Sequence, residues 1–188
     1  MYRMLVIGLS AGGIPLIKRI LNALPQEYPL PVAIVAHLPS GHESCLAELL
    51  NNDTPLPVSN AMDKEKIVAG HVYLAPPDYH LLVEKGLHFA LSVDEPVMSV
   101  RPSINVLFES AAEVFEEKLI AVLLSGANSD GAEGMAYVKK LGGLGIVLDP
   151  QECEFSTMSS AAINRGEVDF VVGIEEIISL LLSVHEQV

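Results

Sequence analysis

Two uninterrupted apolar runs, LIAVLL at residues 119–124 and LGIVL at residues 144–148, constrain the fold more than any other feature. A strand with no polar alternation must be covered on both faces, as strands of a parallel sheet flanked by helices are. Residues 4–9 and 32–36 form similar runs, and amphipathic stretches such as residues 14–24 lie between them. Strands that alternate with helices predict an α/β fold, with a doubly wound, mostly parallel sheet and helices on both faces.

The remaining elements complete this pattern. We expect further helices at residues 43–50, 103–118, 132–141, 158–165 and 175–188, and further strands at 72–75 and 170–172. Residues 79–83 and 87–91 read as two strands joined at Lys85-Gly86, which predicts an antiparallel hairpin at one edge of the sheet. The 188 residues contain no repeat or long linker, so we expect one domain over residues 1–188.

Composition narrows the class of protein. The formal net charge is −13, and an acidic surface repels phosphate backbones, which argues against a nucleic-acid partner. No apolar stretch reaches the roughly 18 residues of a membrane span, and the first residues lack the pattern of a signal peptide, so we expect a cytoplasmic protein with no membrane insertion. No cofactor is implied. Asp78 and His80 share a strand face but suggest no third metal ligand, so we expect no metal site.

Ser10 lies in the glycine-rich segment GLSAGG, directly after the first predicted strand. Ligands bind open parallel sheets at the carboxyl ends of their strands. The helix that follows supplies free N–H groups and a positive dipole end, which suit a developing oxyanion. The spacing resembles the nucleophile elbow G-x-S-x-G, but a phosphate-binding turn and a plain structural turn remain open as alternatives. The dinucleotide fingerprint G-x-G-x-x-G is excluded, because Ser10 occupies its second glycine position.

His37 follows the second predicted strand at its carboxyl end. From there it could reach Ser10 on the adjacent strand and take its proton. The alternative is a loop histidine satisfied by backbone groups. His42, near the start of the next predicted helix, is expected to be structural.

Asp130 lies in the loop SGANSDG, after the strand at residues 119–124. A carboxylate there could orient His37 and stabilise its charged form. Alternatively, Asp130 or Ser129 could be the N-cap of the helix that follows. Taken together, Ser10, His37 and Asp130 would place a nucleophile, a base and a carboxylate on one rim of the sheet, as acyl transfer requires.

Several ordered motifs extend these observations over nearly the whole chain. They are IGLSAGG, VAHLPSGH, GHVYLAPPDYHLLV, RPSINVLFESAAEVF, LLSGANSDGAEGM and INRGEVDFVV. In this order they resemble the catalytic domain of the chemotaxis protein-glutamate methylesterases, the CheB family. The resemblance implies hydrolysis of γ-glutamyl methyl esters on chemoreceptor helices, with glutamine deamidation in some members. It also implies a Ser10-His37-Asp130 triad, with an oxyanion held by backbone N–H groups near Ala11 and Ala127.

The chain departs from the family pattern around the substrate rather than in the implied triad. The usual threonine, glutamine, methionine, histidine and aspartate are replaced by Ala11, Ala36, Ala127, Val100 and Asn105, and residues 155–160 differ as well. A backbone N–H survives such a change, so the oxyanion donors are expected to persist while the pocket wall differs. These departures bear on the substrate more than on the chemistry.

Partners follow from the same resemblance. We expect methylated receptor helices or another methylated protein as substrate. Arg101 is expected either to anchor an acidic helix or to serve as a cap or surface ion pair. The sequence starts at the catalytic domain without a receiver domain, which predicts a constitutive enzyme or one controlled by a separate partner. The competing hypotheses are a non-catalytic binding module with the same fold and a nucleotide-binding protein, which would lack a phosphate-binding lysine after Gly13.

Overall fold

The structure is a computed structural model that describes residues 1–37 and 45–184. Within these ranges a parallel sheet of seven strands runs in the order β3-β4-β2-β1-β7-β8-β9. The strands are β1 (Met4–Leu9), β2 (Val32–Ala36), β3 (Val58–Asn60), β4 (Val72–Leu74), β7 (Leu119–Leu123), β8 (Leu144–Leu148) and β9 (Phe170–Val172). The doubly wound parallel fold predicted from the sequence is confirmed.

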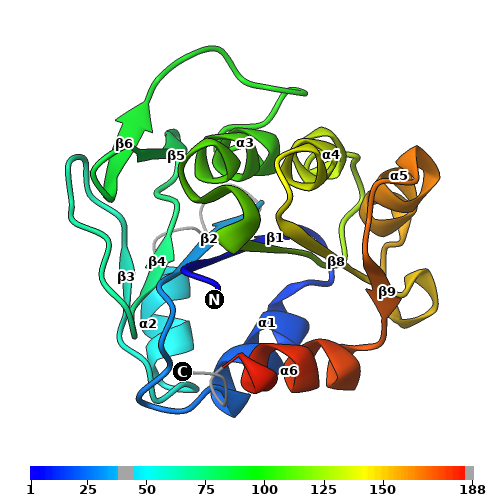
Figure 1. Cartoon of the computed structure of the whole chain (residues 1–188), viewed down its shortest axis with the longest axis horizontal. Helices are drawn as coiled ribbons and strands as arrows, with labels where there is room; N and C mark the ends of the chain where they lie inside the picture. Colours follow the sequence, from blue (N-terminus) through cyan, green and yellow to red (C-terminus); the bar gives the residue numbers. More distant parts are fainter. Residues whose placement is uncertain (38–44, 185–188) are drawn as a thin grey trace.

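Helices cover both faces of the sheet (Figure 1). One face carries α1 (Ile14–Ala23), α2 (Leu46–Asn51) and α6 (Ile174–Ser183), and the other carries α3 (Ile104–Phe115), α4 (Ala132–Lys140) and α5 (Thr157–Arg165). Ile7 and Leu9 of β1 belong to one buried apolar layer, whereas Met4 and Val6 belong to the other. Because the strand buries side chains on both faces, it needs no polar alternation.

The chain changes direction across the sheet at β1. Strands from the first part of the chain, β2, β4 and β3, lie on one side of β1, and β7, β8 and β9 lie on the other. The register aligns Leu9 with Ala36 and Gly8 with Leu123, so the segments after β1, β2 and β7 emerge at one edge. This is the topological switch point at which open α/β sheets bind ligands.

The predicted antiparallel hairpin is formed by β5 (His80–Glu84) and β6 (His88–Ser92), which make a two-stranded sheet of their own. It packs against α3, as Figure 1 shows, and Val83 N donates to Ser110 Oγ of α3 at 3.1 Å. Leu81 and Phe89 are buried in the same apolar layer as α3. The hairpin therefore covers α3 and does not lengthen the seven-stranded sheet.

Several boundaries differ from the sequence-based expectation. Strand β3 was not predicted, because it has three residues of which Val58 alone is buried. Helix α3 ends at Phe115 and is followed by the 3-10 helix η2 (Glu116–Lys118), and a second 3-10 helix, η3 (Pro150–Glu152), follows β8. The start of the helix predicted at residues 43–50, together with His42, lies outside the described residues.

Within residues 1–37 and 45–184, every helix is too short or too polar to cross a bilayer.

Replacing Ile146 with alanine should test how much this two-sided core contributes to stability. Ile146 lies in β8 and is 0% exposed, so Ile146→Ala is expected to lower the free energy of unfolding by about 2–5 kcal/mol. Val171 in the neighbouring strand β9 is 40% exposed, and Val171→Ala should stay within about 0.5 kcal/mol. Denaturant unfolding of both variants measures the difference, and equal losses would contradict a core buried on both faces.

Candidate active site

Ser10 lies in a tight turn between β1 and α1. Gly13 N donates to Ser10 O at 3.0 Å, and Gly12 has a φ of +76°, the positive value that the third residue of a type II turn requires. A Cβ atom at Gly12 would also lie 2.7 Å from the Cβ atom of Glu154. Both conformation and space therefore require glycine at residue 12, and the turn holds Ser10 half-buried at the rim of the sheet.

His37 lies beside this turn because β1 and β2 end together. Its backbone N donates to Leu9 O at 3.0 Å, one step beyond the Leu9–Ala36 pair. Neighbouring strands are roughly 5 Å apart, so the Ser10 and His37 side chains start within reach of each other. The described polar contacts of the ring are with Asp130 and Asn128, and no hydrogen bond joins it to Ser10 Oγ in the described part of the chain. Such bonds often tighten only when substrate binds.

The carboxylate of Asp130 is completely buried. Ser103 Oγ and Asn105 N donate to Oδ1 at 2.9 and 3.1 Å, and Ile104 N donates to Oδ2 at 2.6 Å. These donors belong to the first turn of α3 and its N-cap. The positive end of the α3 dipole therefore faces the carboxylate, which favours its charged form.

The alternative in which Asp130 or Ser129 caps the following helix is wrong. The N-cap residue of α4 is Gly131, and neither the Asp130 nor the Ser129 side chain accepts from a described N–H group of that helix. Asp130 caps α3 instead, across 26 residues of sequence in its bond to Ile104 N. Asn105 of α3 in return accepts hydrogen bonds from Gly131 N and Gly134 N at 2.9 and 2.8 Å. The two helix starts are thus tied to each other, and Asp130 is held between them.

The environment of Asp130 fixes its charge. Burial by itself would raise its pKa, but hydrogen bonding to His37, Ile104 N, Asn105 N and Ser103 outweighs burial, so the pKa is lowered from its usual value. His37 Nε2 is buried and lies 3.0 Å from Asp130 Oδ2, although its N–H does not point straight along that line. A small turn of the His37 ring would align its Nε2–H with the carboxylate oxygen. A charged carboxylate beside the ring suits a base that must become positive.

Asn128 lies on the other side of the ring. Its Nδ2 atom is 3.3 Å from His37 Nδ1, and its Oδ1 atom accepts a hydrogen bond from Asp130 N at 3.1 Å. One amide group thus touches both the imidazole and the backbone of the residue that carries the carboxylate.

The buried side chain of His80 is hydrogen-bonded to the N-cap residue of α3. Ser103 N donates to His80 Nδ1 at 3.2 Å, and His80 Nε2 lies 3.2 Å from Glu95 O. Both ring nitrogens are used, and the side chain is buried. His80 therefore links the β5–β6 hairpin and the loop after it to the helix end that holds Asp130.

Two backbone N–H groups, those of Ala11 and Ala127, belong to the two loops that meet at Ser10. Neither donates a hydrogen bond to any described residue. The carbonyl of Ser10 points to Gly13 N, and that of Gly126 accepts from Met158 N at 3.0 Å. Since the C=O and N–H of a trans peptide point in opposite directions, both N–H groups face away from these packed contacts.

Ser125 joins the Ser10 turn to the segment after β8. Its Oγ atom donates to Ala11 O at 2.8 Å, has Phe155 O as a second possible acceptor at 3.2 Å, and accepts from Phe155 N at 3.1 Å. Ser125 O also accepts from Ser10 N at 2.9 Å. A Cβ atom at Gly126 would lie 3.0 Å from Ser10 Cβ, so the two loops are packed closely at the nucleophile candidate.

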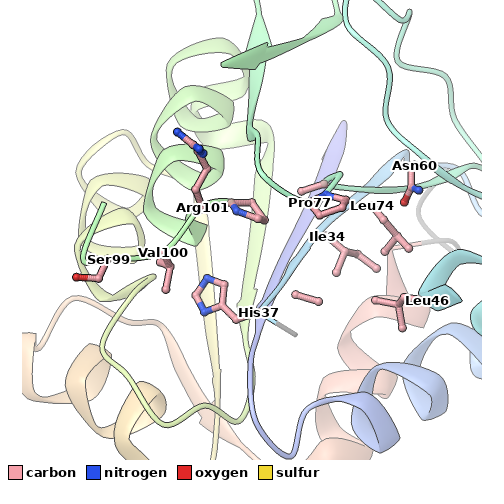
Figure 2. Close-up of a pocket in the computed structure, with 12 residues that line it drawn as sticks. Ile34, His37, Leu46, Asn60, Leu74, Pro77, Ser99, Val100 and Arg101 are labelled. Carbon is pink, nitrogen blue, oxygen red and sulfur yellow. The ribbon is translucent and has the colours of Figure 1, made fainter. Parts of the chain in front are cut away.

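Arg101 points away from His37, as Figure 2 shows. Its Nη1 atom donates to Val93 O and Asp94 O at 2.9 and 3.0 Å, so the guanidinium braces the loop after β6. Arg101 and Val100 are among the residues that line a cavity of about 280 Å³ beside His37. A role for Arg101 in anchoring substrate stays a prediction.

In residues 1–37 and 45–184, no group of three or more His, Cys, Asp or Glu side chains is arranged to hold a metal ion.

Sequence reasoning found the three rim residues but missed the side chains that hold them. These are His80, Ser103, Asn105, Ser125 and Asn128. Ser125 and Asn128 lie in the loop that was singled out for Asp130, so their polarity was a usable signal. His80 and Asn105 were noticed for other reasons, His80 as a metal-ligand candidate and Asn105 as a departure from the family pattern, and nothing in the sequence showed that both lie at the start of α3 beside Asp130.

Asp130→Asn should report on the buried carboxylate. An amide presents one oxygen and one donor where three N–H or O–H groups need acceptors, so we expect a loss of about 1–3 kcal/mol in the free energy of unfolding at pH 7. The folded-state pKa of Asp130 lies below its unfolded value of roughly 3.9. The stabilisation is therefore present above about pH 4 and is lost as the pH falls through the lower folded-state value.

Denaturant unfolding between pH 7 and pH 2 measures this effect. The gap between wild type and Asp130→Asn should narrow below about pH 4. Asp53 pairs with Lys18 at the surface, so Asp53→Asn should change stability by less than about 1 kcal/mol at every pH. A gap that stays constant down to pH 2 would contradict the lowered pKa.

Comparison with known proteins agrees with this geometry. A protein from Leptospira interrogans is 44% identical over 185 residues, which cover 98% of this chain and 96% of that protein. The Nitrosospira multiformis protein-glutamate methylesterase/protein-glutamine glutaminase is 35% identical over 95% of this chain, which spans about half of that protein's length (50%). The crystal structure of the Thermotoga maritima CheB methylesterase catalytic domain matches with a TM-score of 0.94 and 33% identity, covering 98% of this chain and 99% of that one.

The model of the CheB methylesterase family matches residues 5–181, which run from within β1 to within α6 and include every strand between them. The implied nucleophile, base and carboxylate positions all lie inside the matched range. The chain belongs to the CheB methylesterase family.

Proposed function

We propose that this chain is a serine hydrolase that removes methyl esters from glutamate side chains, with Ser10 as nucleophile, His37 as general base and Asp130 as the carboxylate that orients it. One observation carries the proposal. A buried carboxylate with a lowered pKa lies 3.0 Å from Nε2 of a histidine that follows β2, next to a serine turn that follows β1. The relatives named for this activity support the choice of ester.

The arrangement assigns a role to each nitrogen of His37. Nε2 faces Asp130, so Nδ1 is the nitrogen left to accept a proton. As Ser10 Oγ attacks the ester carbonyl, its proton moves to Nδ1. The imidazolium that forms is stabilised by the Asp130 charge, which stays ionised throughout.

The second half of the reaction uses the same groups. The tetrahedral intermediate collapses, the bond to the methoxy oxygen breaks, and Nδ1 returns the proton so that methanol leaves. Water then attacks the glutamyl ester on Ser10, with Nδ1 again taking and returning the proton. The products are a glutamate carboxylate, methanol and free Ser10 Oγ–H.

The oxyanion is held by the N–H groups of Ala11 and Ala127. Both are free of hydrogen bonds to described residues and face away from the packed loops. The dipole of α1, which starts at Ile14, adds positive potential at the same turn. Ser125 fixes the Ala11 carbonyl and so limits the motion of this donor.

The proposed substrate is a methylated glutamate on a chemoreceptor helix or on another methylated protein in the cytoplasm, with glutamine deamidation as a related reaction. A methyl ester is uncharged, so an acidic protein with a net charge of −13 does not repel the reacting group itself. Val100, where the family pattern has histidine, makes the cavity beside His37 more apolar.

Ser10→Ala should abolish methanol release from methylated receptor. We expect a loss of at least about 10³-fold, because the covalent step has no other nucleophile. Ser129→Ala changes another serine in the rim loops and should keep wild-type rates. A fluorophosphonate should label Ser10 in the wild type and leave Ser10→Ala unlabelled. Unchanged methanol release by Ser10→Ala would refute the nucleophile, and an unlabelled, inactive wild type would favour a binding module.

Ser125→Ala should slow the chemistry without unfolding the protein. Removing the bonds to Ala11 O and Phe155 is expected to cost about 1 kcal/mol of stability and to slow fluorophosphonate labelling by about tenfold. Ser110 is a matched control, since its Oγ also has two carbonyl oxygens in reach of its proton, Val106 O and Leu107 O, and accepts from Val83 N, away from the rim. Ser110→Ala should lose similar stability and keep its labelling rate. Equal labelling rates in the two variants would show that Ser125 does not support the turn.

A further inference from the structure

Asn128 is the described side chain that touches His37 on the nitrogen facing away from Asp130. Its Nδ2 atom lies 3.3 Å from Nδ1, and its Oδ1 atom lies 3.1 Å from Asp130 N. The orientation of this amide follows from its second contact. A backbone N–H can only donate, so the atom that faces Asp130 N must be the oxygen.

The protons on the imidazole follow from the same logic. With Oδ1 turned to Asp130 N, the NH₂ group faces His37 Nδ1 and can only donate to it. Nδ1 must then carry a lone pair, and the proton of the neutral ring is on Nε2. That nitrogen lies 3.0 Å from the Asp130 carboxylate, which can only accept.

We propose that Asn128 is a positioning residue that fixes the tautomer of His37, so that the ring enters the reaction with its lone pair on Nδ1. This inference rests on the proposed function, in which Nδ1 takes the proton of Ser10. In a neutral imidazole the proton can occupy either nitrogen, and the form with Nδ1–H cannot act as that base. Asn128 and Asp130 favour the same tautomer from opposite sides of the ring.

The contact between Asn128 and His37 belongs to the state of the site before substrate binds. Nδ1 pairs with the Asn128 amide, and Ser10 Oγ makes no hydrogen bond to the ring within the described residues. Before Ser10 can attack the substrate, Nδ1 of His37 must exchange its contact with the Asn128 amide for one with the Ser10 hydroxyl. Once Nδ1 is protonated, the NH₂ group offers it no acceptor, so the proton goes on to the departing methoxy oxygen.

The bond from Asp130 N to Oδ1 ties this control to the carboxylate. Asn128, which faces Nδ1 of His37, also holds the backbone of Asp130, whose carboxylate faces Nε2. Asp130 is the charged group that the described contacts place on the ring, and the guanidinium of Arg101 points elsewhere. Tautomer and ring position are thus set together by one loop.

Asn128→Asp tests the proposal because it keeps the shape and the oxygen that faces Asp130 N. The new carboxylate accepts from Nδ1–H instead of donating to Nδ1. We expect the rising limb of the pH profile of kcat/KM for methanol release to move up by at least about one pH unit, with a tenfold or greater loss at pH 7. Asn51 also uses both amide atoms, on Val58 N and Val58 O, far from the rim. Asn51→Asp should leave the profile unchanged.

Nitrogen-15 NMR of histidine-labelled protein supplies a readout that does not need activity. His37, assigned by the signals lost in His37→Asn, should show an unprotonated Nδ1 and a protonated Nε2 in the wild type. Asn128→Asp should move the proton to Nδ1. Because Asp130 still favours Nε2–H, Asn128→Ala should keep that tautomer as the major form but add a measurable share of Nδ1–H, without raising the limb of the pH profile, and it serves if Asn128→Asp fails to fold.

The outcomes separate the two proposals. A wild-type ring protonated on Nδ1, a pure Nε2–H tautomer in Asn128→Ala, or a pH profile of Asn128→Asp equal to that of Asn51→Asp would overturn the role of Asn128. If Ser10→Ala retained methanol release, the proposed function would fail, yet the NMR result would still decide which nitrogen Asn128 controls.

Discussion

The rim of this sheet depends on one buried negative charge. Removing a carboxylate from water is costly unless donors replace its hydration, and Asp130 meets that condition with Ser103, two α3 backbone N–H groups and His37. The donors differ in kind: two are backbone N–H groups at a helix start, one is the hydroxyl of the N-cap residue, and one is an imidazole nitrogen. The Asp130 carboxylate therefore stabilises both the start of α3 and the His37 ring. If either moved away, the buried charge would lose hydrogen-bond donors.

Further hydrogen bonds connect the surroundings of Asp130 to more distant parts of the fold. Asn105 and Asp130 cap each other's helices, and His80 connects the start of α3 to the loop after β6. The β5–β6 hairpin, which lies outside the main sheet, is thereby coupled to the reacting groups. A hairpin packed on a helix would have little bearing on chemistry by itself. Here it fixes the helix end whose dipole keeps Asp130 charged.

The sequence predicted the sheet, most helices and the three rim positions, because apolar runs and glycine turns are local patterns. It did not reveal β3, whose three residues carry too little pattern to recognise. It assigned Asp130 to the wrong helix when treated as a cap, since a cap from a distant loop has no local signature. Asn128 was passed over for a related reason: its importance lies in which atoms face His37 and Asp130, and only coordinates supply that.

The change of direction at β1 has a consequence for how the protein is made. Ser10 and His37 belong to the first three dozen or so residues, whereas Asp130 follows β7, which pairs with β1 from the opposite side. The ribosome releases the N-terminal part of a chain first, and a domain generally folds as a unit. A nascent chain would thus display its serine and histidine long before the strand that delivers the carboxylate exists. In the proposed function the triad is complete only when β7 pairs with β1, so assembly of the sheet itself would time the onset of hydrolysis.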